Sequence, residues 1–179
     1  MQTFELSPYP VKDLPEIEIV GTVERIGNQL SLLYEVRGDV ESILLHSPSV
    51  PTRKDDLWMA TCFEFFLAVT GTAGYWEFNM SPSGDWNVYC MDEYRRIGFR
   101  EESAIWQLPF KFQKRETGLS LDIVLDLSPI IPAEEKIEIG ISAVIQTNDN
   151  KETHWALSHP NEWASQPDFH LRESFVLEV

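Results

Sequence analysis

The sequence predicts an all-β protein, an antiparallel two-sheet β-sandwich of the immunoglobulin-like or jelly-roll-like kind with about ten or eleven strands. Three observations predict it. Short runs of β-forming residues alternate apolar and polar side chains, turn-forming residues close most of these runs, and no long stretch has helical periodicity. Because 179 residues suffice for one sizeable core but are few for two, we expect a single domain over residues 1–179.

The N-terminal half contains five of the expected strands. Ile17–Arg25 and Gln29–Val36 alternate along their length, and Glu41–His46 is a shorter run that prolines close. Thr61–Val69 is a strongly apolar run of β-formers that ends at a Thr-Gly-Thr turn. Tyr75–Met80 alternates again, with its polar residues on one face and its large apolar residues on the other.

The C-terminal half continues the same pattern. The turn residues Ser81–Gly84 lead into Trp86–Met91, so we expect a hairpin with the preceding strand. Four later runs alternate in the same way: Ala104–Phe112, Leu119–Leu127, Lys136–Gln146 and Glu173–Val179. Two stretches have the pattern of single helical turns, Asp55–Ala60 and Leu127–Ile131.

Charge and composition limit the partners and the location. With 14 basic and 29 acidic residues the formal charge is −15, which a nucleic-acid backbone or an anionic membrane repels. No apolar run reaches the about 20 residues that cross a bilayer, and the first residues lack the basic and apolar segments of a signal peptide. Cys62 and Cys90 fit buried reduced thiols. We therefore expect a cytoplasmic protein without nucleic-acid or membrane partners.

The first of three unusual stretches runs from Trp58 to Glu64. Trp58 lies in a turn, whereas Glu64 is embedded in an apolar strand, where alternation places it on one face with Cys62 and Phe66. A buried carboxylate needs an arginine or a hydroxyl partner, or it becomes protonated. Either Glu64 is a solvated strand residue beside a packed tryptophan, or both residues belong to a site.

The second stretch is the predicted hairpin around residues 75–86. Glu77 and Asn79 share a face and are expected to lie beside the strand that carries Glu64. With Arg95 they form either a polar network that satisfies itself or a set of donors and acceptors for hydroxyl groups. The alternative is an ordinary hairpin.

The third stretch is rich in tryptophan and histidine and contains the remaining candidates: Trp155, His159, Trp163, Asp168 and His170. One interpretation is an ordered loop whose rings cap the core. His159, Asp168 and His170 have metal-ligand chemistry, but their spacing fits no compact zinc template. A Ca²⁺ site built from Asp and backbone oxygens is also open, and we predict no metal or other cofactor.

Carbohydrate recognition accounts for all three stretches together. Sugar rings offer apolar faces on which indole rings stack, while Asn, Glu, Asp, Arg and His side chains bind the hydroxyls. The six tryptophans are enough for such a site, and equally enough for a core. We expect a non-catalytic binding module for a small polar ligand, a carbohydrate or a sugar derivative.

Several motif blocks also carry a family resemblance. They occur in this order: Leu57–Trp58, Thr61–Glu64, Trp76–Asn79, Ser81–Gly84 with Trp86, Tyr94–Arg95, Trp155–Pro160 and Pro167–His170. In this order they resemble bacterial DOMON-like domains, which are grouped with the family 9 carbohydrate-binding modules. The likeness extends over roughly residues 40–175.

The resemblance implies a β-sandwich in which two tryptophans clamp a terminal sugar ring, the first one six positions before an acidic strand residue. Trp58 and Glu64 have this spacing. The resemblance implies Trp155 as the second clamp residue, with Trp163 as the alternative. Those modules are usually secreted and attached to a glycanase. Because the first residues of this chain do not have the pattern of a signal peptide, we expect its ligand to be a small intracellular sugar or sugar derivative instead. Haem-binding DOMON members use Met and His ligands, which leaves haem as a further alternative.

Two other functional classes stay open. Glu64 and Glu77 are an acid/base pair in principle, since glycosidases use two carboxylates about 5–10 Å apart, but no nucleophile motif accompanies them. A structural domain or one that binds a protein partner is the other class, and it predicts buried tryptophans and an exposed apolar sheet surface.

Overall fold

The structure is a computed structural model that describes residues 1–95, 99–161 and 163–179. In the described part the chain forms twelve strands and three short 3₁₀ turns. The strands are β1 Gln2–Pro8, β2 Ile17–Ile26, β3 Gln29–Gly38, β4 Cys62–Val69, β5 Tyr75–Met80, β6 Trp86–Met91, β7 Arg100–Glu101, β8 Phe110–Arg115, β9 Gly118–Asp126, β10 Ile137–Gln146, β11 Glu152–Ala156 and β12 Leu177–Glu178. The 3₁₀ turns are η1 Val40–Ser42, η2 Leu57–Met59 and η3 Arg172–Ser174.

The all-β antiparallel prediction is confirmed, but the expected separation into two sheets is not. The strands follow one hydrogen-bonded path, β7-β6-β5-β4-β10-β11-β1-β2-β3-β9-β8, and β12 adds to β10. β1 joins the halves because it pairs with β2 along most of its length and with β11 at Ser7 and Pro8. The result is a single sheet that curls over, not the two unconnected sheets of an immunoglobulin-like or jelly-roll sandwich.

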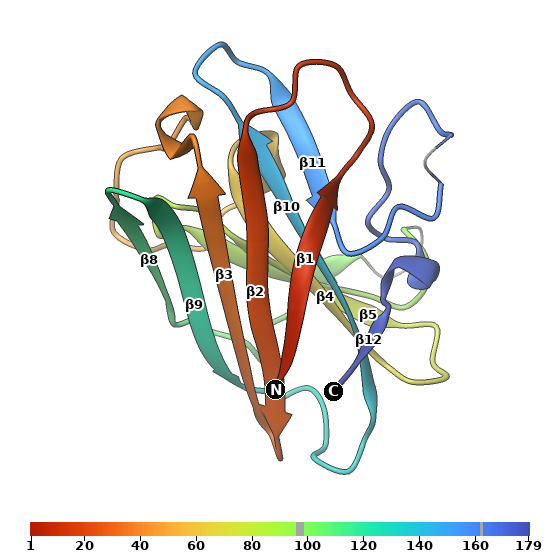
Figure 1. Ribbon diagram of the computed structural model, residues 1–179. Helices are drawn as coiled ribbons and strands as arrows, with labels where there is room; N and C mark the ends of the chain where they lie inside the picture. Colours follow the sequence, from red (N-terminus) through yellow and green to blue (C-terminus); the bar gives the residue numbers. More distant parts are fainter. Residues whose placement is uncertain (96–98, 162) are drawn as a thin grey trace.

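The main core lies between the two halves of the curled sheet. Figure 1 shows β8, β9, β3, β2 and β1 in front of β10, β4 and β5. Alternate residues of both halves point inward, so that Phe63, Phe65 and Leu67 of β4 meet inward side chains of β3 and β9 in one hydrophobic cluster. Phe65 stacks on Phe78 with ring centroids 4.3 Å apart. The alternation seen in the sequence therefore builds this core.

Two expected strands are wrong, for physical reasons that the structure makes clear. Glu41–His46 forms η1 and one isolated bridge, from Ile43 to Thr147, because it closes the end of β10 rather than joining the sheet. Ala104–Phe112 contributes only the start of β8. The carbonyl of Glu102, just before this segment, and that of Ile105, within it, accept hydrogen bonds from the guanidinium of Arg53. These carbonyls are therefore not used for pairing with a neighbouring strand.

Three strands were not predicted: β1, β7 and β11. β1 has only two inward apolar residues, Phe4 and Leu6, so its alternation is short. β11 lies in a segment that reads as a histidine- and tryptophan-rich loop. Of the expected Glu173–Val179 strand, only β12 forms.

Candidate functional site

A row of buried polar side chains crosses the outer face of the sheet, away from the main core. Antiparallel pairing sets Asn87 of β6 opposite Asn79 of β5, Asn79 opposite Glu64 of β4, and Glu64 opposite Ser142 of β10. All four are at least 97% buried. A polar row inside a structure costs free energy unless its members bond to one another or to a ligand, so this face is not an ordinary packing surface.

The next row on the same face is aromatic and acidic. Tyr89 lies opposite Glu77, and Glu77 lies opposite Phe66. Phe66 in turn faces Gly140, where a Cβ atom would come within 2.8 Å of the Phe175 ring. The glycine leaves room for Phe175 to pack on Phe66, with ring centroids 5.6 Å apart. The C-terminal segment thereby covers part of this face.

The rest of the face is open and forms a cleft of about 360 Å³. Its floor is made of strand residues that point outward: Glu64, Phe66, Glu77, Met91, Val144, Glu152 and His154. Its walls come from turns and loops: Trp58, Arg95, Phe99, Pro167, Phe169 and His170. The cleft therefore lies where turn η2, the segment after β6 and the loop after β11 converge on the sheet.

Glu64 is the most unusual group in the cleft. Its side-chain atom Oε2 accepts a hydrogen bond from the Ser142 hydroxyl at 3.2 Å, whereas Oε1 is buried and has no partner among the residues that the structure describes. Burial and the nearby charge of Glu77 together raise the pKa of Glu64 to about 8, while the Ser142 bond opposes the shift. A hydroxyl partner was one of the two expected for a buried Glu64, and burial favours the protonated form of this carboxyl.

Glu77 is the second carboxyl on the floor. Its Oε1 accepts a hydrogen bond from the Asn79 amide at 2.7 Å, and Oε2 lies 3.7 Å from Nε2 of His170. Burial raises the pKa of Glu77 to about 7, although the Asn79 bond and the charge of Arg95 oppose the shift. Burial and the charge of Arg95 lower the pKa of His170 to about 4, so this imidazole is neutral.

Asp168 organises the wall opposite the floor. Its carboxylate accepts hydrogen bonds from the Arg95 guanidinium at 2.9 Å, from the backbone N–H of His170 at 3.0 Å, and from the Tyr94 hydroxyl. The charge of Arg95 is thus paired within the wall. Asp168 positions Arg95 and His170 rather than lining the cleft itself.

An aromatic group encloses one end of the cleft. Trp58 packs edge-to-face on Tyr89 with ring centroids 6.0 Å apart, and Tyr89 stacks on Phe99 at 4.8 Å. The Tyr89 hydroxyl donates to Asp55 at 2.7 Å, which fixes the ring beneath the turn that carries Trp58. Trp58 is half-buried, and so part of its indole is free to contact a ligand.

The structure brings most of the predicted site residues together. Five of the ten line the cleft: Trp58, Glu64, Glu77, Arg95 and His170. Asn79 and Asp168 stand directly behind them as hydrogen-bond partners. We expected Glu77 and Asn79 to lie beside the strand that carries Glu64, and the pairing of β4 with β5 places them there.

The other three predicted residues, Trp155, His159 and Trp163, lie outside the cleft. The expectation that Trp58 and Trp155 form a clamp is therefore wrong. Trp155 is 4% exposed within the main core, where its indole N–H donates to the Thr153 hydroxyl at 3.0 Å, so no ring face is left for a sugar. Trp163 is 90% exposed and does not line the cleft.

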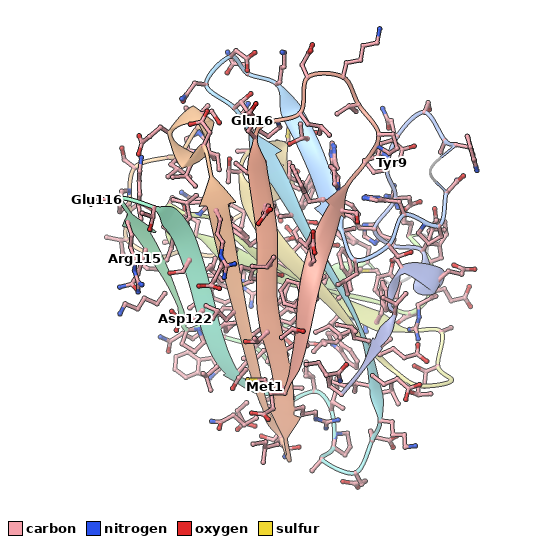
Figure 2. All side chains as sticks on the ribbon, in the orientation of Figure 1. Met1, Tyr9, Glu16, Arg115, Glu116 and Asp122 are labelled. Atoms are coloured by element: carbon pink, nitrogen blue, oxygen red, sulfur yellow. The ribbon has the colours of Figure 1, made fainter. Side chains whose placement is uncertain are left out.

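His159 has an anchoring position. One of its ring nitrogens, Nε2, lies 2.8 Å from the carbonyl oxygen of Ser7, and its ring contacts Tyr9. Tyr9, labelled in Figure 2 beyond the end of β1, donates its hydroxyl to the carbonyl of Ala164. These contacts tie the loop after β11 to β1 and so hold the cleft wall in place.

Sequence reasoning missed several lining residues, among them Phe66, Phe99, Phe169, Glu152 and His154. The strand alternation that placed Glu64 outward also places Phe66 outward. Glu152 and His154 follow the same rule on β11, and their side chains form a 3.0 Å pair. That signal was available only after β11 was recognised as a strand.

The fold has counterparts among solved structures, although no family model and no curated protein matches the chain. A Bacteroides uniformis protein described as a candidate carbohydrate-binding protein superposes with a TM-score of 0.73 at 15% identity, covering 97% of this chain and 84% of that one. A family 9 carbohydrate-binding module from Caldicellulosiruptor kristjanssonii, solved with cellotriose, gives 0.53 at 12% identity, covering 89% and 76%. The same module with glucose gives 0.53, covering 89% and 78%.

These superpositions show that the chain shares its fold with the two named proteins. The DOMON-like resemblance has no matching family model and stays a prediction. In the parts of the chain that the structure describes, no three or more His, Cys, Asp and Glu side chains gather as a metal site would require. Within those same parts, every helix is too short or too polar to span a bilayer.

Proposed function

We propose that this chain is a single, non-catalytic domain that binds a small carbohydrate or sugar derivative in the cleft on the outer face of β10, β4, β5 and β6. The observation that carries the proposal is the partly exposed indole of Trp58 in the same cleft as the buried carboxyls of Glu64 and Glu77. An indole face and converging polar groups are what a sugar ring requires. The structural likeness to carbohydrate-binding proteins supports the same class of ligand.

The chemistry of the floor suits hydroxyl groups. A protonated Glu64 donates one hydrogen bond and accepts others, so it serves either partner of a sugar hydroxyl. Its unpartnered Oε1 is satisfied when a ligand donates to it. The proposal places the protein in the cytoplasm, which the free thiols of Cys62 and Cys90 support.

Tryptophan fluorescence tests the proposal directly. The wild-type protein, titrated with a panel of monosaccharides and disaccharides, should change its emission in a saturable way, and Trp58→Ala should lose that change. Trp163→Ala is the matched control, because Trp163 is exposed but lies outside the cleft. A panel without any response, or a response that persists in Trp58→Ala and disappears in Trp163→Ala, would contradict the proposal.

Glycoside hydrolysis is the second candidate, because two carboxyls with raised pKa values share one cleft. We rank it below binding for a geometric reason. Glycosidase carboxyls flank the scissile bond, whereas Glu64 and Glu77 are diagonal neighbours on the same floor of the cleft. Release of nitrophenol from a panel of nitrophenyl glycosides, lost in Glu77→Gln, would favour the enzyme instead.

A further inference from the structure

Acidic side chains outnumber basic ones on the floor of the cleft. Glu64, Glu77 and Glu152 line it, and Glu64 makes no ion pair among the described residues. Its Oε1 has no hydrogen-bond partner among the described residues, and the side chain is 3% exposed and lines the cleft. A buried polar atom without a hydrogen-bond partner is costly, so Oε1 is a point at which a polar group of a ligand would lower the free energy.

The second carboxyl lies within reach of the same donor group. Glu77 faces Phe66, two residues beyond Glu64 on β4, which makes Glu64 and Glu77 diagonal neighbours on one face. Diagonal neighbours in a sheet have Cα atoms about 7–8 Å apart, a separation that one group between the two side chains spans. Asn79 occupies one oxygen of Glu77 and leaves the other toward His170 and the cleft.

The cationic side chains that face these carboxyls are already engaged or neutral. Arg95 is paired with Asp168, and burial lowers the pKa values of His154 and His170, which favours the neutral form of both imidazoles. The other titratable groups around Glu64 are neutral at pH 7: the thiol of Cys62 and the hydroxyls of Tyr34 and Tyr75, whose pKa values burial raises. Among the described residues Arg95 is the one Lys or Arg side chain that lines the cleft, and its guanidinium is bound to Asp168 rather than to Glu64 or Glu77.

The aromatic side chains of the floor and the walls are suited to a cation as well. Trp58, Phe66 and Phe169 line the cleft, and aromatic faces attract ammonium groups within about 6 Å. The chain charge of −15 steers cations toward the protein and anions away. A hydroxyl group would bond to Glu64 Oε1 but would bring no positive charge to either carboxyl.

We propose that the ligand carries a protonated amino group, as an amino sugar does, and that this ammonium binds between Glu64 and Glu77. The inference rests on the proposed function, because it takes the same cleft and names the class of sugar. The ammonium donates to Glu64 Oε1 and to the free oxygen of Glu77, and Trp58 contacts the sugar ring. Each carboxyl that is protonated before binding releases its proton to the buffer as the ion pair forms.

Calorimetric titration with glucosamine, glucose and N-acetylglucosamine at pH 7 tests the inference. These probes share the ring, and only glucosamine carries a cationic nitrogen. We expect glucosamine to bind at least tenfold more tightly than the other two. Its heat should also differ between phosphate and Tris buffers, because released protons are taken up by the buffer. The other two sugars should give the same heat in both buffers.

Two variants locate the effect. Glu64→Gln and Glu77→Gln should each reduce the preference for glucosamine over glucose to less than threefold, while Trp163→Phe should keep it. Circular dichroism confirms that each variant is folded, and the comparison of the three sugars on the wild-type protein needs no variant at all.

The outcomes separate this inference from the proposed function. Equal affinity for glucosamine and glucose, without proton release, overturns the amino-sugar inference and leaves carbohydrate binding in place. Binding of cyclohexylamine as tightly as glucosamine supports the ammonium subsite and overturns the carbohydrate assignment. Absence of binding by all of the sugars and by the amine overturns both.

Discussion

The hydroxyl of Tyr75 lies 2.9 Å from Nδ1 of His170 and so joins the floor of the cleft to its wall. Tyr75 belongs to β5, whereas His170 follows the loop after β11, 95 positions later in the chain. The two rings also meet edge-to-face, with centroids 5.9 Å apart. This contact fixes the separation between Glu77 below and the Asp168–Arg95 pair above.

Removing this hydroxyl should loosen the wall without disturbing the core. We expect Tyr75→Phe to cost about 0.5–1.5 kcal/mol of unfolding free energy, the typical value of one hydrogen bond, and to weaken sugar binding several-fold. Amide hydrogen exchange should speed up in residues 167–170 and stay unchanged in β9. Unchanged exchange in the loop would mean that other contacts hold the wall.

The two buried carboxyls predict a pH dependence of stability. Their folded pKa values, about 8 for Glu64 and about 7 for Glu77, are above the ordinary carboxyl value. At a pH between the ordinary carboxyl pKa and these raised values, the folded chain keeps protons that the unfolded chain has lost. The free energy of unfolding therefore falls as pH rises. Lowered pKa values of His154 and His170 act in the opposite sense below about pH 6.5, which makes pH 6.5–8 the clearest window.

Over that window we expect the wild-type free energy of unfolding to fall by about 1–2 kcal/mol. Glu64→Gln keeps a neutral group in place and should remove most of the fall above pH 7. Urea denaturation at half-unit pH steps measures both proteins. A wild-type stability that rises steadily from pH 6.5 to pH 8 would show that Glu64 is ionised in the folded protein.

The tryptophans should divide into structural and binding residues. Trp155→Phe keeps a ring in the core but loses the bond to Thr153, and we expect a loss of about 1–2 kcal/mol of stability with unchanged affinity. Trp58→Ala removes a half-buried side chain and should change stability by less than about 1 kcal/mol. Its affinity for sugar should fall at least tenfold, about 1.4 kcal/mol. The reverse pattern in denaturation and titration would contradict the site.

Gly140 should tolerate no side chain. A Cβ atom at this position would come within 2.8 Å of the Phe175 ring, so Gly140→Ala must displace the segment that covers Phe66. We expect a loss of about 1–3 kcal/mol, as in other overpacked sites, and faster proteolysis of the C-terminal residues. Gly140→Ala with Phe175→Leu should recover part of the loss. A single variant as stable as wild type would show that Phe175 moves aside freely.

The strand alternation was enough to predict the floor of the cleft. Once Thr61–Val69 and Tyr75–Met80 were identified as strands, the pleat fixed Glu64, Glu77 and Asn79 on one face, and the hairpin order brought β5 beside β4. Local sequence carries this information because a strand has a period of two residues. The main core followed from the same rule.

The second tryptophan could not be predicted in this way. Trp155 points inward because β11 pairs with β10, where it lies opposite Ala143, and this pairing depends on a turn that the sequence pattern did not reveal. Residues 104–109 of the expected strand were misassigned because Arg53, some 50 positions earlier, donates to the carbonyls of Glu102 and Ile105. Both errors come from contacts between distant parts of the chain, which periodicity does not record.

The most direct test of the central claim is amide chemical-shift mapping during titration with a sugar that binds. The account predicts saturable shift changes that cluster on β4 and β5, on β11 and in residues 167–170, and that are absent from β2, β3 and β9. Saturable changes on those front strands, or around exposed Trp106, with the cleft unaffected, would contradict it.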